Sequence, residues 1–369
     1  MRVVFVTNVY PNDFGIADGI FVHEQAKMMQ EKGCEVDVLY IDLRSARKKR
    51  RWGKSQEEYE GINIFHYSIL LGPIPILMDI LYLIVQKWAL YDYIKRNGIP
   101  DIIHAHFYIN AYFSNELKKE YGIRYLITEH SSELYQQKIS MLHRYIIKKA
   151  YDNADYVIAV SEALKKRMER YTERDIVTIP NMLSDKFYYD GNNKKGFHFL
   201  FVGHVIESKG VRILLEAFNE LQQSLKDVSL TIVGEGALKK ELMEYAKSRH
   251  LDVIFMGEIA HEYLPDVYRK SHCFVLPSKM ETFGISYIEA LASGIPVIAT
   301  RCGGPEEFIN TENGILISVD SKKELYEAMK KIYDNIIGYS GKEISENTIK
   351  KYGKAAVGEA LMKLYLGDI

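Results

Sequence analysis

Short runs of β-branched and aromatic residues alternate along the chain with longer amphipathic stretches. This alternation predicts parallel strands joined by crossover helices. A polar stretch at 184–196, ending in GNNKKG, interrupts the rhythm and predicts a linker. Before it, strands are predicted at 2–7, 35–40, 62–66, 101–106, 124–128 and 156–160, and helices at 19–32, 77–95 and 140–151. After it, strands are predicted at 197–202, 229–233, 253–255, 273–276 and 296–299, and helices at 210–224, 239–248, 262–270 and 284–292.

The pattern predicts an α/β fold of two doubly wound, Rossmann-like domains in series. With 369 residues, 47% of them hydrophobic, the chain is larger than one core normally becomes. We expect a first domain at 1–183 and a second at 184–351, with a helix at about 352–369 packing back on the first. Ligands of such sheets sit beyond the carboxyl ends of the strands, so two facing domains predict a cleft between them.

Composition excludes some functions. A formal net charge of −1 provides no field that would attract a nucleic acid. Cys34, Cys273 and Cys302 are odd in number and lack zinc-ligand spacing, which favours reduced thiols in a cytoplasmic protein. The amino-terminal MRVVFVTN has too short an apolar run for a signal peptide and predicts the first strand.

The run ETFGISYIEALASGIPVIAT, residues 281–300, carries two carboxylates around an aromatic-glycine turn. A carboxylate accepts two hydrogen bonds side by side, which suits a vicinal diol of a sugar. Glu281 precedes the turn and Glu289 lies in the following helix, too far away to hold the same atom. An isolated pair of glutamates is more often a solvated cap and a surface helix residue. The amides at the start of this helix would suit a diphosphate; they belong to Thr282, Phe283 and Gly284.

The pair is not isolated, because ETFGISYIEALASGIPVIATRCGGPEE resembles the signature of the retaining glycosyltransferases of family 4, which have the GT-B fold. Other pieces follow in the order that this family uses. They are GIFVHEQAKMMQEKGCEVDVL, DIIHAH, TEH, IPN, FVGHVIESKG, TIVGEG, PSKMETFGISYIEA and NGILI. The resemblance covers the chain except for residues 44–60 and 185–195. A lone pair of glutamates would be a weak signal, whereas the ordered set is specific.

The resemblance implies roles for residues of the second domain. Lys209 in ESKG would pair with the donor diphosphate, as an ammonium can. Glu289 would hold the nucleotide ribose, and Glu281 would lie near the donor sugar hydroxyls, with the amides of Phe283 and Gly284 on the diphosphate. Further glycines would let the backbone approach the donor; they are Gly203, Gly234 and Gly236.

In the first domain, His130 in TEH matches the histidine beside the anomeric centre. His104 and His106 in HAH lie at a strand end, where we expect alternating faces to direct only one of them to the cleft. We assign His106 and Tyr108 to the acceptor side and His104 to the core. Gly19 matches a glycine where the chain passes close to the donor phosphate.

Two departures from the family pattern bear on donor binding. Asp18 stands where the commoner form has a second glycine, and His204 stands where arginine is usual. Histidine is charged only below a pKa of about 6.5 unless its surroundings raise it. We therefore expect donor binding to weaken as the pH rises through the deprotonation of His204, unless His204 makes only a neutral hydrogen bond.

The function implied is a metal-independent hexosyl- or N-acetylhexosaminyltransferase acting with retention on a nucleoside diphosphate sugar, with uridine favoured. No paired-acid metal motif stands at a suitable strand end. The basic run RSARKKRRWGK, residues 44–54, and the apolar stretch 69–90 favour a lipid-linked or cell-surface saccharide as acceptor, and peripheral contact with the anionic inner face of a membrane. A solvated loop and a core helix at 77–91 explain the same residues equally well.

Two other functions remain compatible with the sequence. A sugar-nucleotide epimerase can share the architecture and would convert the donor alone. A non-catalytic sugar-nucleotide-binding subunit would bind without turnover, as Asp18 and His204 suggest. A dinucleotide oxidoreductase is disfavoured, because TNVYPNDFG after the first strand lacks GxGxxG.

Overall fold

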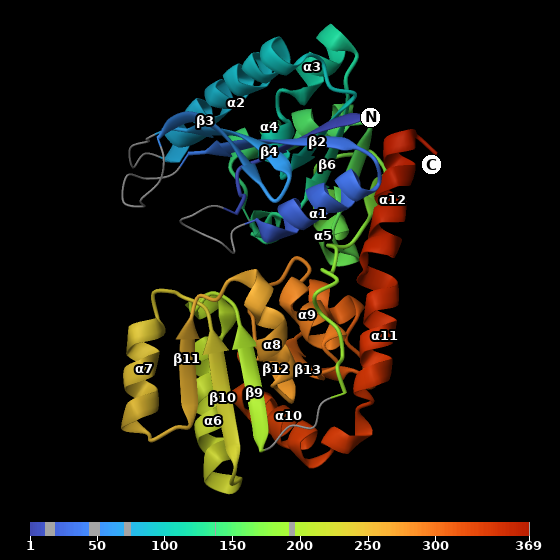
Figure 1. The fold of residues 1–369 in the computed structure, drawn as a ribbon. Helices are drawn as coiled ribbons and strands as arrows, with labels where there is room; N and C mark the ends of the chain where they lie inside the picture. The colour runs from blue at the N-terminus through green and yellow to red at the C-terminus, as the bar shows by residue number, and fades with distance from the viewer. Residues whose placement is uncertain (12–18, 44–51, 70–74, 137, 192–195, 369) are drawn as a thin grey trace. The chain divides into compact units, whose positions relative to one another are not determined.

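A computed structural model of the chain describes residues 1–11, 19–43, 52–69, 75–136, 138–191 and 196–368, without the side chains of 75–77. Two compact units are present (Figure 1). The first comprises Met1–Met182 and Val357–Ile369, and the second Leu183–Ala356. The chain thus passes between units at Leu183 and Val357, whereas the sequence analysis places the boundaries at 184 and 352. Each unit is built on a largely parallel sheet, as predicted.

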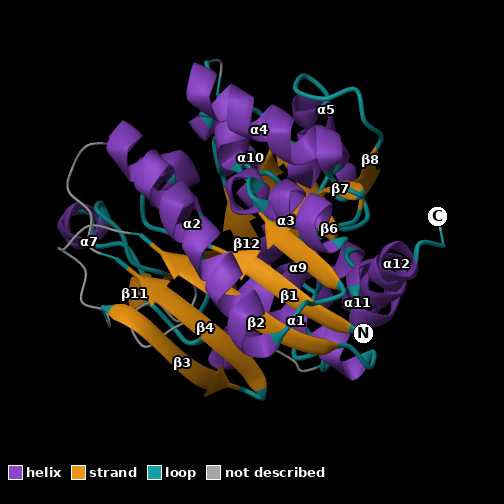
Figure 2. Cartoon of the chain, turned by 90° about the horizontal axis from the view of Figure 1, so that it is seen from above, coloured by secondary structure: helices purple, strands orange, loops and turns teal. Residues whose placement is uncertain are grey.

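The sheet of the first unit has the order β3-β4-β2-β1-β5-β6-β7-β8 (Figure 2). Every neighbouring pair is parallel except β3 and β4. The strand order reverses direction between β1 and β5, which is the place where such sheets bind ligands. The strands are β1 Arg2–Thr7, β2 Glu35–Asp42, β3 Gly53–Tyr59, β4 Ile62–Ser68, β5 Ile102–His106, β6 Arg124–Glu129, β7 Tyr156–Ala159 and β8 Ile176–Thr178.

Helices cover both faces of this sheet (Figure 1). The α-helices are α1 Ile20–Glu31, α2 Pro75–Asn97, α3 Ser114–Tyr121, α4 Met141–Asn153, α5 Glu162–Met168 and α12 Lys354–Leu366. Short 3₁₀ turns follow two strands, η1 Tyr108–Ala111 after β5 and η2 Ser132–Tyr135 after β6. Serine side chains cap α4 and α5, since the hydroxyls of Ser140 and Ser161 accept backbone N–H groups of the first turn.

The prediction of a loop at 44–54 is wrong at its carboxyl end, because β3 begins at Gly53. This antiparallel edge strand has the sequence GKSQEEY and is largely exposed. It carries no alternating apolar residues from which a strand could be predicted. Residues 44–51 lie outside the described part of the chain.

The carboxyl-terminal helix packs on the first unit, as predicted. Val357, Leu361 and Leu364 of α12 belong to the same core as the strands of the first sheet. A Cβ at Gly358 would lie 2.5 Å from the sulfur of Met28 in α1, so a glycine lets the two helices approach closely. The hydroxyl of Tyr365 forms a hydrogen bond with a buried histidine, His104, with 2.6 Å between Oη and Nδ1.

The sheet of the second unit is entirely parallel, with the order β11-β10-β9-β12-β13-β14. Numbered within the unit this is 3-2-1-4-5-6, the order of dinucleotide-binding domains, which reverses between β9 and β12. The strands are β9 Phe197–Val202, β10 Val228–Val233, β11 Val253–Gly257, β12 Cys273–Leu276, β13 Val297–Thr300 and β14 Gly314–Ile317. The helices are α6 Val211–Ser224, α7 Lys239–Ser248, α8 Leu264–Arg269, α9 Ile285–Ala292, α10 Lys322–Asp334 and α11 Gly341–Tyr352, with 3₁₀ turns η3 Glu207–Lys209, η4 His261–Tyr263, η5 Gly304–Glu307 and η6 Ile336–Gly338.

Candidate functional site

The strands that flank the reversal point of the second sheet each supply one charged residue. Lys209 follows β9 and Glu281 follows β12, and Nζ of Lys209 lies 2.7 Å from Oε1 of Glu281. Both side chains are mostly buried, with relative exposures of 24% and 11%. Ser278, which is fully buried, donates to the same carboxylate oxygen at 2.7 Å. The two residues that the sequence analysis assigned to phosphate and sugar therefore meet in one ion pair.

Backbone contacts hold the loops around this ion pair together. The amide of Lys279 donates to the carbonyl of Ser208 at 2.8 Å, which joins the β12 loop to the β9 loop. The amide of Gly304 donates to the carbonyl of Glu281 at 3.0 Å, which adds the β13 loop. Gly210 has φ +68°, and a Cβ there would lie 2.1 Å from the carbonyl oxygen of Pro277. Only glycine permits this approach.

Helix α9 begins next to Glu281. Its N-cap residue, Gly284, has φ 93° and ψ 66°, a left-handed conformation that favours glycine. Phe283 is buried against Phe308 and Tyr352, so the aromatic residue of the turn anchors the loop in the core of the unit. The free N–H groups of the first turn of a helix favour an anion at this position.

Glu289 is buried in α9 rather than exposed on the helix surface. It is 4% exposed, and its carboxylate oxygens contact Nε2 of His261 at 2.9 Å and the hydroxyl of Tyr268 at 3.0 Å. Burial, reinforced by this carboxylate, raises the pKa of Tyr268 well above its ordinary value, so the hydroxyl stays protonated and donates. Sequence reasoning missed both partners, because neither His261 nor Tyr268 stands in a motif.

The glycines of the β9 and β10 loops make room for protein backbone. A Cβ at Gly234 would lie 2.0 Å from the carbonyl oxygen of Gly203, and one at Gly236 would lie 2.2 Å from that of Val205. The side of each glycine that a side chain would occupy is therefore filled by a neighbouring loop. His204, in the β9 loop, is exposed, and its part in donor binding stays a prediction.

In the first unit, His130 follows β6 at the carboxyl edge of the sheet. Its Nε2 lies 3.1 Å from Nδ1 of His106, the last residue of β5. The rings of Phe21 and Phe107 contact the imidazole, with centroids 4.5 and 5.2 Å away. Burial lowers the pKa of His130 to about 3, so the imidazole is neutral at physiological pH.

The expectation that only one histidine of HAH points to the ligand side is wrong. His104 and His106 are two positions apart, and side chains alternate with a period of two, so both lie on one face of β5. Their rings stack with centroids 4.8 Å apart, and both residues are fully buried. The assignment of His104 to the core fits this burial, but His106 is equally buried beneath His130.

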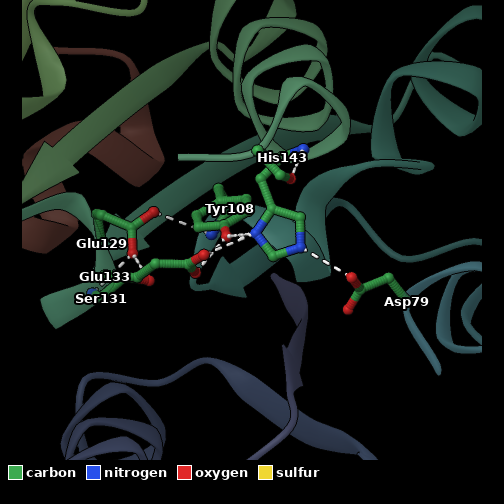
Figure 3. A network of polar contacts seen from close by, with 7 residues as sticks. Asp79, Tyr108, Glu129, Ser131, Glu133 and His143 are labelled. Atoms are coloured by element: carbon green, nitrogen blue, oxygen red, sulfur yellow. Dashed lines mark hydrogen bonds and ion pairs between the residues drawn. The ribbon is translucent and has the colours of Figure 1, made fainter. Parts of the chain in front are cut away.

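A buried carboxylate, Glu129, fixes the loops on both sides of His130. Its oxygens accept hydrogen bonds from the amide of Tyr108 at 2.9 Å and from the amide and hydroxyl of Ser131 (Figure 3). The amide of His130 donates to the same carboxylate at 3.0 Å. Tyr151 adds a hydroxyl at 2.7 Å. Burial raises the pKa of Glu129, and these donors oppose the increase by stabilising the carboxylate. No motif marks this residue apart from its place in TEH.

Next to these loops, His143 lies between two carboxylates (Figure 3). Its Nδ1 is 2.7 Å from Glu133 and its Nε2 is 2.9 Å from Asp79 of α2. Tyr108, assigned to the acceptor side, is 3% exposed, and its hydroxyl donates to Glu133 at 2.7 Å. The hydrogen bonds to the two carboxylates raise the pKa of His143 to about 9, Glu133 contributing most. We call these four side chains the His143 cluster.

Gly19 packs against the chain that follows β1. It has φ +76°, and a Cβ would lie 2.6 Å from the carbonyl carbon and oxygen of Val9. The close approach to Val9 is enough to account for a glycine at this position, without a donor phosphate nearby. Its neighbour Asp18 lies outside the described residues.

Within the described residues, no helix is both long enough and apolar enough to cross a membrane. Among its described side chains, α2 buries one face, which includes Tyr82, Ala89 and Tyr93. The opposite face exposes Ile80, Ile84 and Trp88 by 45%, 58% and 50%.

Comparison with known proteins agrees with this architecture. Residues 19–186 match the model described as Glycosyltransferase Family 4, and residues 188–355 match Glycosyl transferases group 1. An uncharacterised glycosyltransferase of Methanocaldococcus jannaschii is 28% identical over 94% of this chain and 93% of its own.

Solved structures of low sequence identity share the fold. The sucrose-phosphate synthase of Thermosynechococcus elongatus superposes with a TM-score of 0.82 at 22% identity, over 99% of this chain and 98% of the other. HepE of Anabaena, solved with UDP and glucose, gives 0.75 at 16% identity over both whole chains. The chain therefore belongs to the group 1 glycosyl transferases of family 4 type, enzymes with the GT-B fold.

Proposed function

We propose that this glycosyltransferase moves a sugar, with retention of configuration and without a metal, from a nucleoside diphosphate sugar to an acceptor hydroxyl. The donor would be bound by the second unit. The observation that carries the proposal is the Lys209–Glu281 ion pair at the reversal point of that sheet, beside the start of α9. An ammonium and a helix N-terminus suit a diphosphate, and a carboxylate suits sugar hydroxyls.

The two carboxylates retain hydrogen-bonding capacity for this task. Both side-chain hydrogen bonds that Glu281 receives from described residues end on Oε1, which leaves Oε2 for a sugar hydroxyl. Each oxygen of Glu289 receives one hydrogen bond and can accept a second, from a ribose hydroxyl. Lys209 would share its charge between Glu281 and the diphosphate as the leaving group departs.

The reaction would proceed with the acceptor hydroxyl attacking the anomeric carbon from the face that the nucleoside diphosphate leaves. The leaving phosphate would take the proton of that hydroxyl. A metal is not needed for this step if Lys209 and the start of α9 balance the developing charge. UDP is the nucleotide we favour, and HepE, which shares the fold, was solved with UDP and glucose.

Thermal unfolding with UDP, GDP, ADP and their sugar conjugates, each with and without EDTA, tests donor binding. A ligand that binds only the folded state raises Tm with occupancy. We expect one nucleotide to raise Tm equally in EDTA, and the increase to fall in Lys209→Met and Glu289→Gln. Lys322→Met is the matched control, because Lys322 also forms an ion pair in this unit, with Glu220. An increase that needs a divalent metal, or persists in Lys209→Met, contradicts the proposal.

Product analysis separates transfer from the alternatives. The anomeric proton of the purified product should show the configuration of the donor, measured by NMR. Inversion would contradict retention. Conversion of the donor without an acceptor would indicate an epimerase, and binding without turnover on any acceptor would indicate a partner subunit.

For the acceptor we propose a lipid-linked saccharide, reached by a first unit that rests on an anionic membrane surface through α2. The exposed residues Ile80, Ile84 and Trp88 are four positions apart and form one apolar stripe. Nζ of Lys54 in β3 lies 5.9 Å from the centroid of the Trp88 ring. Trp52, two residues before Lys54 in the sequence, is also exposed. The basic residues of 44–51 directly precede Trp52 in the sequence. Apolar and basic side chains together suit an anionic bilayer surface.

Flotation with vesicles of phosphatidylcholine, alone or mixed with phosphatidylglycerol, tests this contact. We expect binding to the mixed vesicles only, and its loss in Ile84→Ser. Ile254→Ser is the matched control, because Ile254 of the second unit is also 58% exposed. Equal loss in both variants, or binding to neither vesicle, contradicts the proposal.

A further inference from the structure

The hydrogen bond between His106 and His130 leaves one nitrogen of each ring without a partner. Nδ1 of His106 and Nε2 of His130 are 3.1 Å apart. The other nitrogens, Nε2 of His106 and Nδ1 of His130, are buried and have no hydrogen-bond partner. Buried polar atoms in proteins are nearly always paired, so two orphan nitrogens in one pair of rings need an explanation.

The neighbouring histidine of the same strand shows that the fold can satisfy such a ring. Nδ1 of His104 contacts the hydroxyl of Tyr365 at 2.6 Å, and Nε2 contacts that of Thr128 at 2.7 Å. His104 and His106 share one face and equal burial. The orphan atoms are therefore specific to the two rings nearest the end of the strand.

The surroundings hold the pair in place without providing hydrogen bonds. Phe107 has φ 70°, which is unusual for a residue with a side chain, and its amide donates to the carbonyl of Thr128 at 2.9 Å. This strained turn places the Phe107 ring beside His130, where it also contacts the ring of Phe21, with 6.4 Å between their centroids. Backbone strain of this kind is typical of functional sites.

The charge state of the pair follows from its burial. Burial lowers the pKa of His130 to about 3 and that of His106 well below its ordinary value, and the neighbouring histidines lower both further. Among the residues that the structure describes, the ionisable groups next to the pair are His104 and Glu129, whose carboxylate binds the backbone amide of His130. Two neutral imidazoles can share one proton only if one ring donates and the other accepts. The tautomer of each ring therefore fixes that of the other.

We propose that His106 is a positioning residue, which holds His130 in one ring orientation and one tautomer so that the orphan Nδ1 of His130 can bond a hydroxyl of a sugar substrate. The proposal rests on the proposed function and on the family resemblance, which implies that His130 lies beside the anomeric centre. A sugar hydroxyl would supply the hydrogen bond that the protein leaves unmade. His106 itself would not touch the substrate.

Imidazole ¹⁵N NMR of histidine-labelled protein tests the tautomer without any assay of activity. A fixed tautomer gives one N–H nitrogen and one bare nitrogen with well-separated shifts, whereas exchange averages them. We expect separated His130 shifts in the wild type, averaged shifts in His106→Leu, and separated shifts again in His106→Asn, whose amide can replace Nδ1. Unchanged His130 shifts in His106→Leu would overturn the proposal, even if the enzyme transfers sugar as proposed.

Kinetics provide the second readout. We expect His106→Leu to lower kcat by about 10- to 100-fold with a small change in the donor KM, since misplacing a reacting group mainly affects the transition state. His106→Asn should recover most of kcat. His104→Leu is the matched control, equally buried on the same face of β5, and should lower stability while kcat is retained. An equal loss of kcat in His104→Leu would indicate a structural role for His106. If instead His130→Ala keeps full activity, the proposed function of His130 fails, while the NMR result stands.

Discussion

The ion pairs of the His143 cluster predict a specific dependence of stability on pH. His143 is 17% exposed and bonds Glu133 and Asp79 through its two nitrogens. Those bonds raise its pKa from about 6.5 to about 9. Because the folded value lies above the unfolded one, the stabilisation is fully present below pH 6.5. It is lost as the pH rises through about 9.

The size of the effect follows from the same pKa. A change from 6.5 to about 9 sets a ceiling of about 3.4 kcal/mol. The carboxylates of Glu133 and Asp79 are 34% and 28% exposed, so water screens the interaction. We therefore expect about 1–2 kcal/mol. The first turn of α4, where His143 lies, disfavours a cation, so the two carboxylates must provide the stabilisation.

Urea denaturation followed by tryptophan fluorescence measures this contribution. Both tryptophans, Trp52 and Trp88, belong to the first unit, so the signal reports on the unit that contains His143. The difference in unfolding free energy between wild type and His143→Gln should shrink by about 1–2 kcal/mol from pH 6.5 to pH 9.5. Because wild type and His143→Gln are compared at the same pH, the contributions of ionisable groups that both proteins contain cancel. An equal difference at the two pH values refutes the reasoning.

Three further predictions concern other parts of the chain. Gly210→Ala should lower the stability of the second unit by about 2–4 kcal/mol in denaturant. Gly122→Ala, in the first unit, has a similar φ of 74° but open space around it, and should lower stability by only about 1 kcal/mol. Equal losses would mean that the approach to Pro277 is unimportant. Burial, reinforced by Glu281, raises the pKa of Cys302 to about 11. Alkylation of Cys302, followed by mass spectrometry, should therefore be about 100-fold slower at pH 8 than alkylation of a free thiol. Bound donor should slow the alkylation further. Alkylation with a midpoint near pH 8.5 would contradict this. Tyr365→Phe should cost about 1–3 kcal/mol in denaturant, because Nδ1 of buried His104 loses its partner; an unchanged midpoint would mean that α12 is held by apolar contacts alone.

Much of the fold could be predicted from the sequence because buried parallel strands are continuous apolar runs. β1, β9 and β12 have the predicted bounds, as does α7. The strands that were missed lie at sheet edges, where burial is lower. β3 is polar and largely exposed, β8 has three residues, and β14 has four. An edge strand owes its structure to pairing with a neighbour, which the local pattern of apolar residues does not encode.

The site residues also divide into those that the local sequence predicts and those that depend on neighbouring elements. Lys209 and Glu281 stand in motifs next to predicted strands, so their approach at one sheet edge could be expected. His261 and Tyr268 could not be found, because they reach Glu289 from a neighbouring turn and helix. Side chains of a strand alternate with a period of two, so the sequence already places His104 and His106 on one face of β5.

The contacts of the two glutamates imply different functions for them. Glu289 is held on both oxygens by donors within the protein, His261 and Tyr268, so it is a fixed acceptor whose geometry does not depend on a ligand. Glu281 is held by a cation that an incoming diphosphate would also attract, so its contacts would change during the reaction. Substitution of Glu289 should therefore act mainly on stability and donor KM, whereas substitution of Glu281 should act mainly on kcat. On this reasoning preorganisation and responsiveness belong to separate carboxylates, with seven residues between them in the sequence.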